Sequence, residues 1–253
     1  MSSTSRDGPD DRPIMLLTGA SRGIGHATVK LFQEKGWRIL TVSRQPFDEA
    51  CAWPAARWSH IQADLAELAQ VETLAATVRS RLPAGRLHAL VNNAGISPKG
   101  PDGARLGVLL SDADAWTRVL NVNLISTALL VRALLPELEA ARGSIVNVTS
   151  IVGSRVHPFA GVAYAASKAA LATLTRELAG ELGPRGIRAN AIAPGEIRTS
   201  ILSPGTDELV ARDVPMGRLG EPREVAETIH FLCSPAASYI NGTEVHINGG
   251  QHV

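Results

Sequence analysis

The chain has 253 residues, of which 45% are hydrophobic and 19% charged, and its formal net charge is +1. This composition is typical of a globular protein, and the balanced charge gives no reason to expect nucleic acid or an anionic membrane as a partner. No apolar run approaches the roughly 20 residues that cross a bilayer. The two cysteines, Cys51 and Cys233, stand in no metal-binding or redox spacing. We therefore expect a soluble, cytoplasmic protein without a metal site.

Residues 1–13 are rich in Ser, Asp, Arg and Pro and are expected to form a loose tail, so that residues 14–253 form a single domain. From there on, strand-like segments alternate with helical ones. The expected strands are 14–17, 37–43, 58–63, 87–91, 144–149, 187–193 and 244–247. The expected helices are 26–35, 66–82, 111–140, 162–182 and 222–233. This alternation predicts an α/β protein with a Rossmann-type doubly wound fold of about seven parallel strands and helices on both faces.

A glycine-rich stretch, Thr18–Gly25 (TGASRGIG), joins the first strand to the first helix. Such a turn presents unpaired backbone N–H groups and the positive end of a helix dipole, which suit a phosphate. We expect Gly19 to make the turn, Gly23 to admit a pyrophosphate, and Gly25 to let helix and strand pack closely. The spacing is not G-x-G-x-x-G, so by itself it fits any glycine-rich turn between a strand and a helix.

Ligands of doubly wound sheets bind outside the carboxyl ends of the strands. In this sequence, polar and glycine residues gather at those ends. They are the glycine turn, Ser43-Arg44, Asp64, Asn92–Gly95, Ser150 and Pro194-Gly195. Their convergence predicts a site on that edge of the sheet.

Seven motifs in this order resemble the short-chain dehydrogenase/reductase family of the compact, single-domain type, from about Pro13 to the C-terminus. They are TGASRGIG, Asp64, Asn92–Gly95, Asn123, Ser150, Tyr164-Ala-Ala-Ser-Lys168 and Pro194-Gly195. The resemblance implies hydride transfer between a nicotinamide cofactor and a carbonyl or secondary alcohol. Within the family, the chain looks most similar to bacterial 3-oxoacyl-[acyl-carrier-protein] reductases, chiefly in 194–195, 215–220 and 245–250.

Tyr164 and Lys168 stand four residues apart in a helical segment, so they project from one face. A phenol with a pKa of about 10 is a poor base at neutral pH, and a nearby ammonium favours its ionised form. The resemblance implies that Tyr164 exchanges the proton, that Lys168 also holds the nicotinamide ribose, that Ser150 binds the substrate oxygen, and that Asn123 holds a relay water. The structural alternatives are a tyrosine beside a snorkelling lysine, a serine bonded to its own backbone, and an asparagine between helices.

The resemblance also implies a set of cofactor-binding residues. They are Gly19, Ser21, Arg22, Gly23, Ile24, Gly25, Arg44, Asp64, Leu65, Asn92, Ala94, Gly95, Tyr164, Lys168, Pro194, Gly195, Ile197 and Thr199. Within this set, Asp64 is expected beside the adenine amino group, and Ile197 and Thr199 beside the nicotinamide carboxamide. Capping of the helix after Asp64 explains that aspartate equally well.

The choice of cofactor follows from the end of the second strand, Thr41-Val-Ser-Arg44, which carries no acid. An NAD site of this fold usually has a carboxylate there to bind the ribose 2′-hydroxyl. Arg44 and Arg22 would instead bind a 2′-phosphate through charge-assisted hydrogen bonds. We therefore predict NADP(H) in preference to NAD(H), the alternative being two solvated arginines.

Three loops are expected to form the substrate face: 97–110, 152–159 and 196–215. Their candidate wall residues are His157, Phe159, Ile201 and Leu202, with His157 interpreted as a solvated loop histidine. The loop 97–110 is longer than in the acyl-carrier-protein reductases, which leaves open a 3-oxoacyl thioester or another small ketone, alcohol or sugar as substrate.

Two further alternatives concern the whole protein. One is a non-catalytic NADP-binding protein on the same fold, against which the four candidate catalytic residues argue. The other concerns the apolar helical segments 112–140 and 162–182, which either bury a homotetramer or dimer interface or pack only within the chain.

Overall fold

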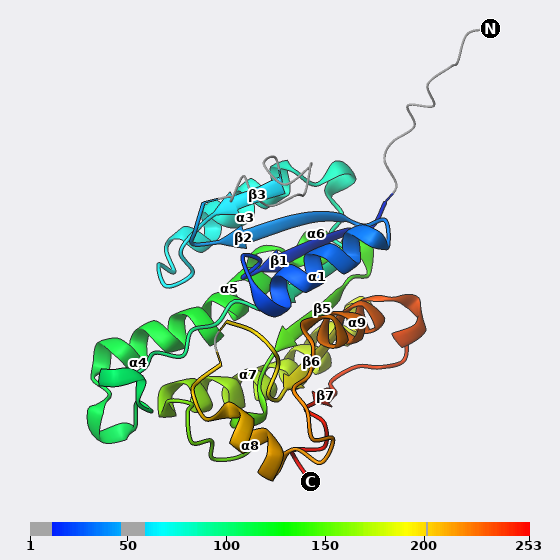
Figure 1. The fold of residues 1–253 in the computed structure, drawn as a ribbon. Helices are drawn as coiled ribbons and strands as arrows, with labels where there is room; N and C mark the ends of the chain where they lie inside the picture. The colour runs from blue at the N-terminus through cyan, green and yellow to red at the C-terminus, as the bar shows by residue number, and fades with distance from the viewer. Residues whose placement is uncertain (1–11, 47–58, 201) are drawn as a thin grey trace, which may run out of the picture.

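The computed structural model describes residues 12–46, 59–200 and 202–253. Within them, seven parallel strands form one sheet in the order β3-β2-β1-β4-β5-β6-β7 (Figure 1). The strands are β1 Ile14–Thr18, β2 Arg38–Ser43, β3 His60–Gln62, β4 Ala89–Asn92, β5 Ser144–Val148, β6 Arg188–Pro194 and β7 Glu244–Ile247. The predicted Rossmann-type fold is confirmed. The strand order changes direction between β1 and β4, which is the point where such sheets bind their ligands.

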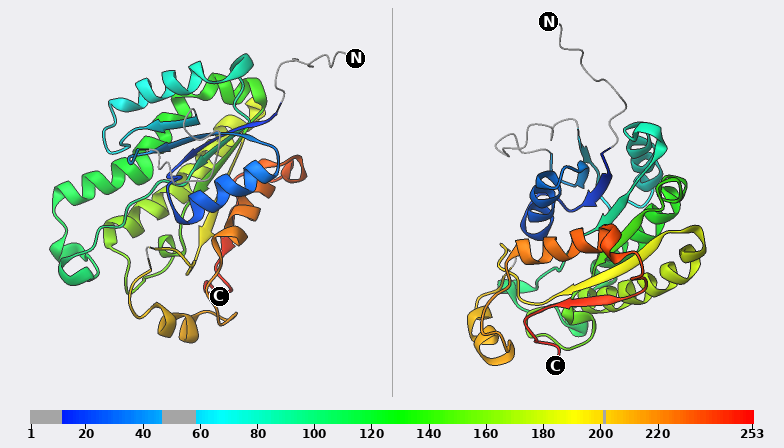
Figure 2. Two further views of the ribbon diagram at one scale, coloured as in Figure 1. Left: turned by 45° about the horizontal axis from the view of Figure 1, so that its top comes forward. Right: turned by 90° about the vertical axis from the view of Figure 1, so that its right-hand side faces the viewer.

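Helices cover both faces of the sheet. On one face, α1 Gly23–Glu34 and α9 Pro222–Cys233 lie side by side (Figures 1 and 2). The helices of the other face are α3 Gln70–Ser80, α4 Ala113–Leu120, α5 Ser126–Ala133, α6 Leu135–Ala141 and α7 Val162–Leu182. A short helix, α8 Thr206–Asp213, lies apart from both layers (Figure 2).

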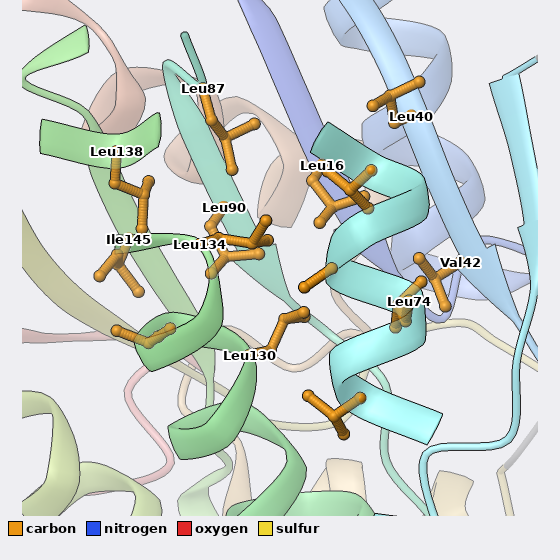
Figure 3. Close-up of a cluster of buried hydrophobic side chains, with 14 of the residues drawn as sticks. Leu16, Leu40, Val42, Leu74, Leu87, Leu90, Leu130, Leu134, Leu138 and Ile145 are labelled. Atoms are coloured by element: carbon orange, nitrogen blue, oxygen red, sulfur yellow. The ribbon is translucent and has the colours of Figure 1, made fainter. Parts of the chain in front are cut away.

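The two core layers follow from the alternation of side chains along buried strands. In β1, Ile14 and Leu16 pack against the layer of α3, α5, α6 and α7, and Figure 3 shows part of this cluster, including Leu74 of α3 and Leu130 of α5. Met15 and Leu17 point to the opposite face and pack against α1 and α9. Because both faces are covered, the strands are mostly apolar, and many polar groups lie at their carboxyl ends.

The predicted single helix over 111–140 is wrong, because the segment is divided into three helices. A π-helical turn, Asn121–Ile125, separates α4 from α5, and Leu134 separates α5 from α6. Pro136 lies in the first turn of α6 and has no N–H to continue the preceding helix. The apolar periodicity runs through both interruptions, so the pattern alone could not reveal them.

Three helix starts also differ from expectation, and the first is α1, which begins at Gly23 rather than at His26. Asp112, not Ser111, caps α4, with its Oδ1 accepting a hydrogen bond from the Ala115 N–H at 2.8 Å. Asp64 does not begin a helix; its Oδ1 accepts from the Ala66 N–H at 2.9 Å in a turn, and α3 starts only at Gln70. The aspartate therefore stays at the strand edge, where its side chain is available to the site.

The tail 1–11, Cys51 and Trp58 lie outside the described residues. In the part that is described, no single helix is both long and apolar enough to cross a membrane. Among the described residues, one pair of helical segments, Ala113–Ala133 and Leu135–Ala141, meets both criteria when taken together, and the two segments are bent by 64° relative to each other. Across residues 12–46, 59–200 and 202–253, no group of three His, Cys, Asp or Glu side chains is placed to hold a metal ion.

Candidate active site

A cavity of about 1100 Å³ lies at the carboxyl ends of the strands. Most of the predicted site residues line it. They are Gly19, Ser21, Arg22, Gly23, Ile24, Arg44, Asp64, Leu65, Ala94, Gly95, Ser150, Tyr164, Lys168, Pro194, Gly195, Ile197 and Thr199. Three predicted residues, Gly25, Asn92 and Asn123, do not line it. Of the candidate substrate-wall residues, His157, Phe159 and Leu202 line the cavity, and Ile201 lies outside the described residues.

The glycine turn has the geometry of a backbone cradle. Gly19 has φ +73°, and a Cβ there would lie 2.8 Å from the Ala94 Cα. A Cβ on Gly25 would lie 2.1 Å from the Gly19 carbonyl oxygen, so no side chain fits at either position. Helix α1 begins at Gly23 with no acidic residue in its first turn, so its N-terminal N–H groups face the cavity without a competing carboxylate. The cavity and this cradle fit the diphosphate of a dinucleotide.

Asn92 and Asn93, at the end of β4, form different hydrogen bonds. The Asn93 Nδ2 donates to the carbonyl oxygens of Thr18 (3.1 Å) and Gly19 (2.8 Å), which holds the glycine turn against β4. The Asn92 side chain points into the core and donates to the Asn147 Oδ1 at 2.9 Å. Side chains of consecutive residues in a strand point to opposite sides, so Asn92 and Asn93 face different surroundings. This alternation can be inferred from the sequence, but the predicted cofactor set included only Asn92.

Tyr164 and Lys168 lie on the same face of α7, with the lysine Nζ 5.6 Å from the centre of the tyrosine ring. The Lys168 Nζ donates to the Val148 carbonyl oxygen at 2.6 Å, and burial lowers the pKa of this lysine to about 8. Burial also raises the pKa of Tyr164, a hydrogen bond with Ser150 acts in the opposite direction, and the Glu196 carboxylate adds to the rise. The phenol is therefore held protonated, whereas the sequence led us to expect the lysine to favour its ionised form.

Ser150 and Asn123 combine local bonds with their place near Tyr164. The Ser150 Oγ accepts a hydrogen bond from the Val152 N–H at 3.4 Å, which is the backbone role considered as its alternative. Asn123 is 1% exposed in the π-helical turn; its Oδ1 accepts from the Ile96 N–H (2.8 Å), and its Nδ2 donates to the Ile96 carbonyl (3.1 Å) and the Ser167 Oγ (2.9 Å). It thus joins the loop after β4 to α7, directly behind the cavity wall.

His157 corrects a sequence prediction. Its Nδ1 accepts from the Phe159 N–H at 3.2 Å, so its Nε2 donates to the Glu196 Oε1 at 2.7 Å. The two side chains are only 11% and 9% exposed, and both line the cavity. The interpretation of His157 as a solvated loop histidine is therefore wrong. Glu196 was missed entirely, because 39 residues separate the partners and no local pattern links them.

Comparison with known proteins places this site in a family. Residues 19–252 match the family described as Enoyl-(Acyl carrier protein) reductase. Protein FixR of Bradyrhizobium diazoefficiens is 59% identical over 95% of this chain and 87% of its own. The 3-oxoacyl-[acyl-carrier-protein] reductase FabG of Vibrio harveyi is 34% identical over 95% and 97%. The crystal structure of a Brucella ovis oxidoreductase of the short-chain dehydrogenase/reductase family, in complex with a partially ordered NAD, is 52% identical over 94% and 100%, with a TM-score of 0.83.

The chain belongs to the short-chain dehydrogenase/reductase family, as its motifs indicated. It is an oxidoreductase of a family that binds a nicotinamide cofactor and acts on carbonyl groups.

Proposed function

We propose that the chain is an NADP(H)-dependent oxidoreductase that transfers a hydride between nicotinamide and a carbonyl or secondary alcohol, with Tyr164 as the acid and base. This proposal rests on one observation: Ser150, Tyr164 and Lys168 line the same cavity as the glycine turn. Nicotinamide, when bound, supplies or accepts the hydride. A direct test is whether the protein oxidises NADPH in the presence of carbonyl compounds.

The proton transfer follows from the environment of Tyr164. Burial keeps the phenol protonated at neutral pH, so during reduction it is ready to donate its proton to the developing alkoxide. Ser150, which is hydrogen-bonded to the phenol, is placed to donate to the same oxygen. Below a pH of about 8 the Lys168 ammonium lies beside the ring and stabilises the phenolate that remains. In the oxidative direction the same groups act in reverse order.

The cofactor half of the cavity supports the preference for NADP(H). Arg22 and Arg44 both line it with exposed side chains, and β2 ends at Ser43, with no acid there. The Ser43 Oγ donates to the Gln45 carbonyl oxygen at 2.8 Å, so the strand end is held by neutral groups. A 2′-phosphate would meet two cations there and no carboxylate at the strand end. The NAD in the Brucella ovis structure belongs to that protein and sets no preference for this one.

Replacing Arg44 with Ala is expected to weaken NADPH binding by about tenfold or more and to change NADH binding by less than about threefold, because only the 2′-phosphate loses a charged partner. Lys35→Ala, at the opposite end of α1, is the matched control and should change neither. Fluorescence titration of both cofactors measures this. Wild-type protein that binds NADH as tightly as NADPH would contradict the assignment.

The substrate candidates remain those that the sequence suggested. The 34% identity to a 3-oxoacyl-[acyl-carrier-protein] reductase supports a 3-oxoacyl thioester. The second candidate is another small ketone, alcohol or sugar, and a charged side chain in the substrate half, Lys99 of the loop 97–110, favours it over the thioester.

We also propose a homotetramer or dimer, supported by apolar side chains that the chain leaves exposed. Ile125 on the π-helical turn is 37% exposed, and Val108, Leu109 and Leu110 on the loop before α4 are between 63% and 97% exposed. Light scattering on a sizing column is expected to give two or four times the 26.7 kDa chain mass. A single species at the chain mass at micromolar concentration would rule this assembly out.

A further inference from the structure

The substrate half of the cavity contains a lysine that the proposed proton transfer does not use. The Lys99 Nζ donates to the Phe159 carbonyl oxygen at 2.6 Å and to the Ser203 Oγ at 3.1 Å. These contacts bring together the three loops that the sequence assigned to the substrate face. Lys99, Phe159 and Ser203 all line the cavity.

The hydrogen bonds that Lys99 forms with described side chains and backbone are both to neutral oxygens. An ammonium has three N–H donors, of which these bonds use two. Among the carboxylates that the structure describes, which do not include that of Asp102 on the same loop, none forms an ion pair with this ammonium. Lys99 is exposed at the cavity wall, and burial of part of its side chain lowers its pKa. An anionic ligand would supply an ionic partner.

A carboxylate, that of Glu196, lies on the same wall of the cavity near Tyr164, the proposed proton donor. The His157 ring stands 5.8 Å from the Phe159 ring, and its Nε2 donates to Glu196, whose carboxylate is close enough to raise the pKa of Tyr164. These contacts link a cation to an anion along one side of the cavity. The order is Lys99, Phe159, His157 and Glu196, with Glu196 beside the Tyr164 phenol. A substrate carboxylate would be attracted by Lys99 and repelled by Glu196, while the Lys168 ammonium is already bonded to the Val148 carbonyl oxygen.

We infer that the substrate is an oxo acid, or the corresponding hydroxy acid, whose carboxylate binds Lys99 while its ketone or alcohol carbon lies at Tyr164. This inference rests on the proposed oxidoreductase function and deepens it. In reduction, the hydride forms the new C–H bond and the Tyr164 proton forms the O–H bond, while the carboxylate is unchanged. Because Glu196 would repel a carboxylate attached directly to the reacting carbon, at least one methylene separates the two groups.

The test compares acids with their neutral esters in the full chain with NADPH. The probes are 4-oxopentanoate and 5-oxohexanoate, each against its methyl ester, with acetoacetyl-N-acetylcysteamine as a neutral 3-oxoacyl thioester. Wild-type protein is expected to show a kcat/KM at least about tenfold higher for an acid than for its ester, as one charge-assisted hydrogen bond provides. Lys99→Met is expected to remove that ratio by lowering kcat/KM for the acids and leaving the esters within about threefold.

Arg105→Met is the matched control, because the Arg105 Nε donates to the Ala160 carbonyl oxygen at 2.9 Å from the same loop but does not line the cavity. This variant should keep the acid-to-ester ratio. A wild-type ratio near one, a preference for the thioester, or equal losses for acid and ester in Lys99→Met would each overturn the inference while leaving the oxidoreductase function intact.

Calorimetric binding of the same acids and esters to the protein saturated with NADP⁺ separates the two proposals. Acids that bind more tightly than esters only when Lys99 is present, without any turnover of these or other carbonyl compounds, would support the anion site and overturn the proposed reaction. Acids that bind no better than esters, or not at all, would overturn the anion site.

Discussion

Replacing Tyr164 with Phe is expected to lower the rate of NADPH-dependent carbonyl reduction by about 10³-fold and to leave NADPH binding within about twofold. General acid catalysis by a positioned side chain contributes about 10²–10⁴ in rate, and the phenol is the group that burial holds in its acidic form. The substitution removes one oxygen atom and keeps the ring against Lys168. Stopped-flow measurement of NADPH oxidation, beside a fluorescence titration of NADPH, gives both quantities.

The chain provides its own control, because its second tyrosine, Tyr239, is fully exposed and distant from the cavity lining. Tyr239→Phe should retain the full rate. If Tyr164→Phe turned over as fast as Tyr239→Phe, another group would have to deliver the proton, and the assignment of Tyr164 would fail.

Replacing Lys168 with Met is expected to lower kcat/KM by about 10²-fold or more and to remove one limb of the pH profile. Burial lowers the pKa of Lys168 to about 8, from its ordinary value of 10.5 in water. A base with a lowered pKa is charged below that value and neutral above it, so the wild-type rate of reduction should fall as the pH rises through about 8. The loss follows because the phenolate formed by proton donation then has no cation beside it.

The methionine variant has no proton to lose at this position, so its low activity should not show that decline between about pH 7 and 9. The comparison is made as kcat/KM against pH for both proteins. A wild-type profile that stays level to pH 10, or a variant that keeps the same decline, would show that the limb does not belong to Lys168.

The fold was predictable because its signals are local. Apolar runs separated by helical periodicity specified the strands and most helices, and the α1 glycine turn followed from three closely spaced glycines. Tyr164 and Lys168 were equally accessible, since a four-residue spacing in a helix fixes a common face. The π-helical turn at Asn121–Ile125 was not, because a one-residue widening of a helix leaves its apolar pattern nearly unchanged.

The substrate half of the site was hidden for a different reason. His157 and Glu196 meet across 39 residues, and Lys99 reaches Phe159 across 60, so only the folded chain brings these charges together. Burial was also invisible in the sequence. It reverses the expected direction of the Tyr164 pKa, because desolvation of the phenolate outweighs the favourable effects of nearby groups.

The central claim, that this site is a working carbonyl reductase, is tested most directly by following NADPH oxidation across ketones, aldehydes, sugars, acyl thioesters and oxo acids. We predict oxidation of one NADPH for each alcohol formed with at least one of these classes, at a rate about 10³-fold lower in Tyr164→Phe. Protein that binds NADPH tightly yet reduces none of these carbonyls and oxidises none of the matching alcohols would be a nucleotide-binding protein without catalysis, and would contradict the proposed function.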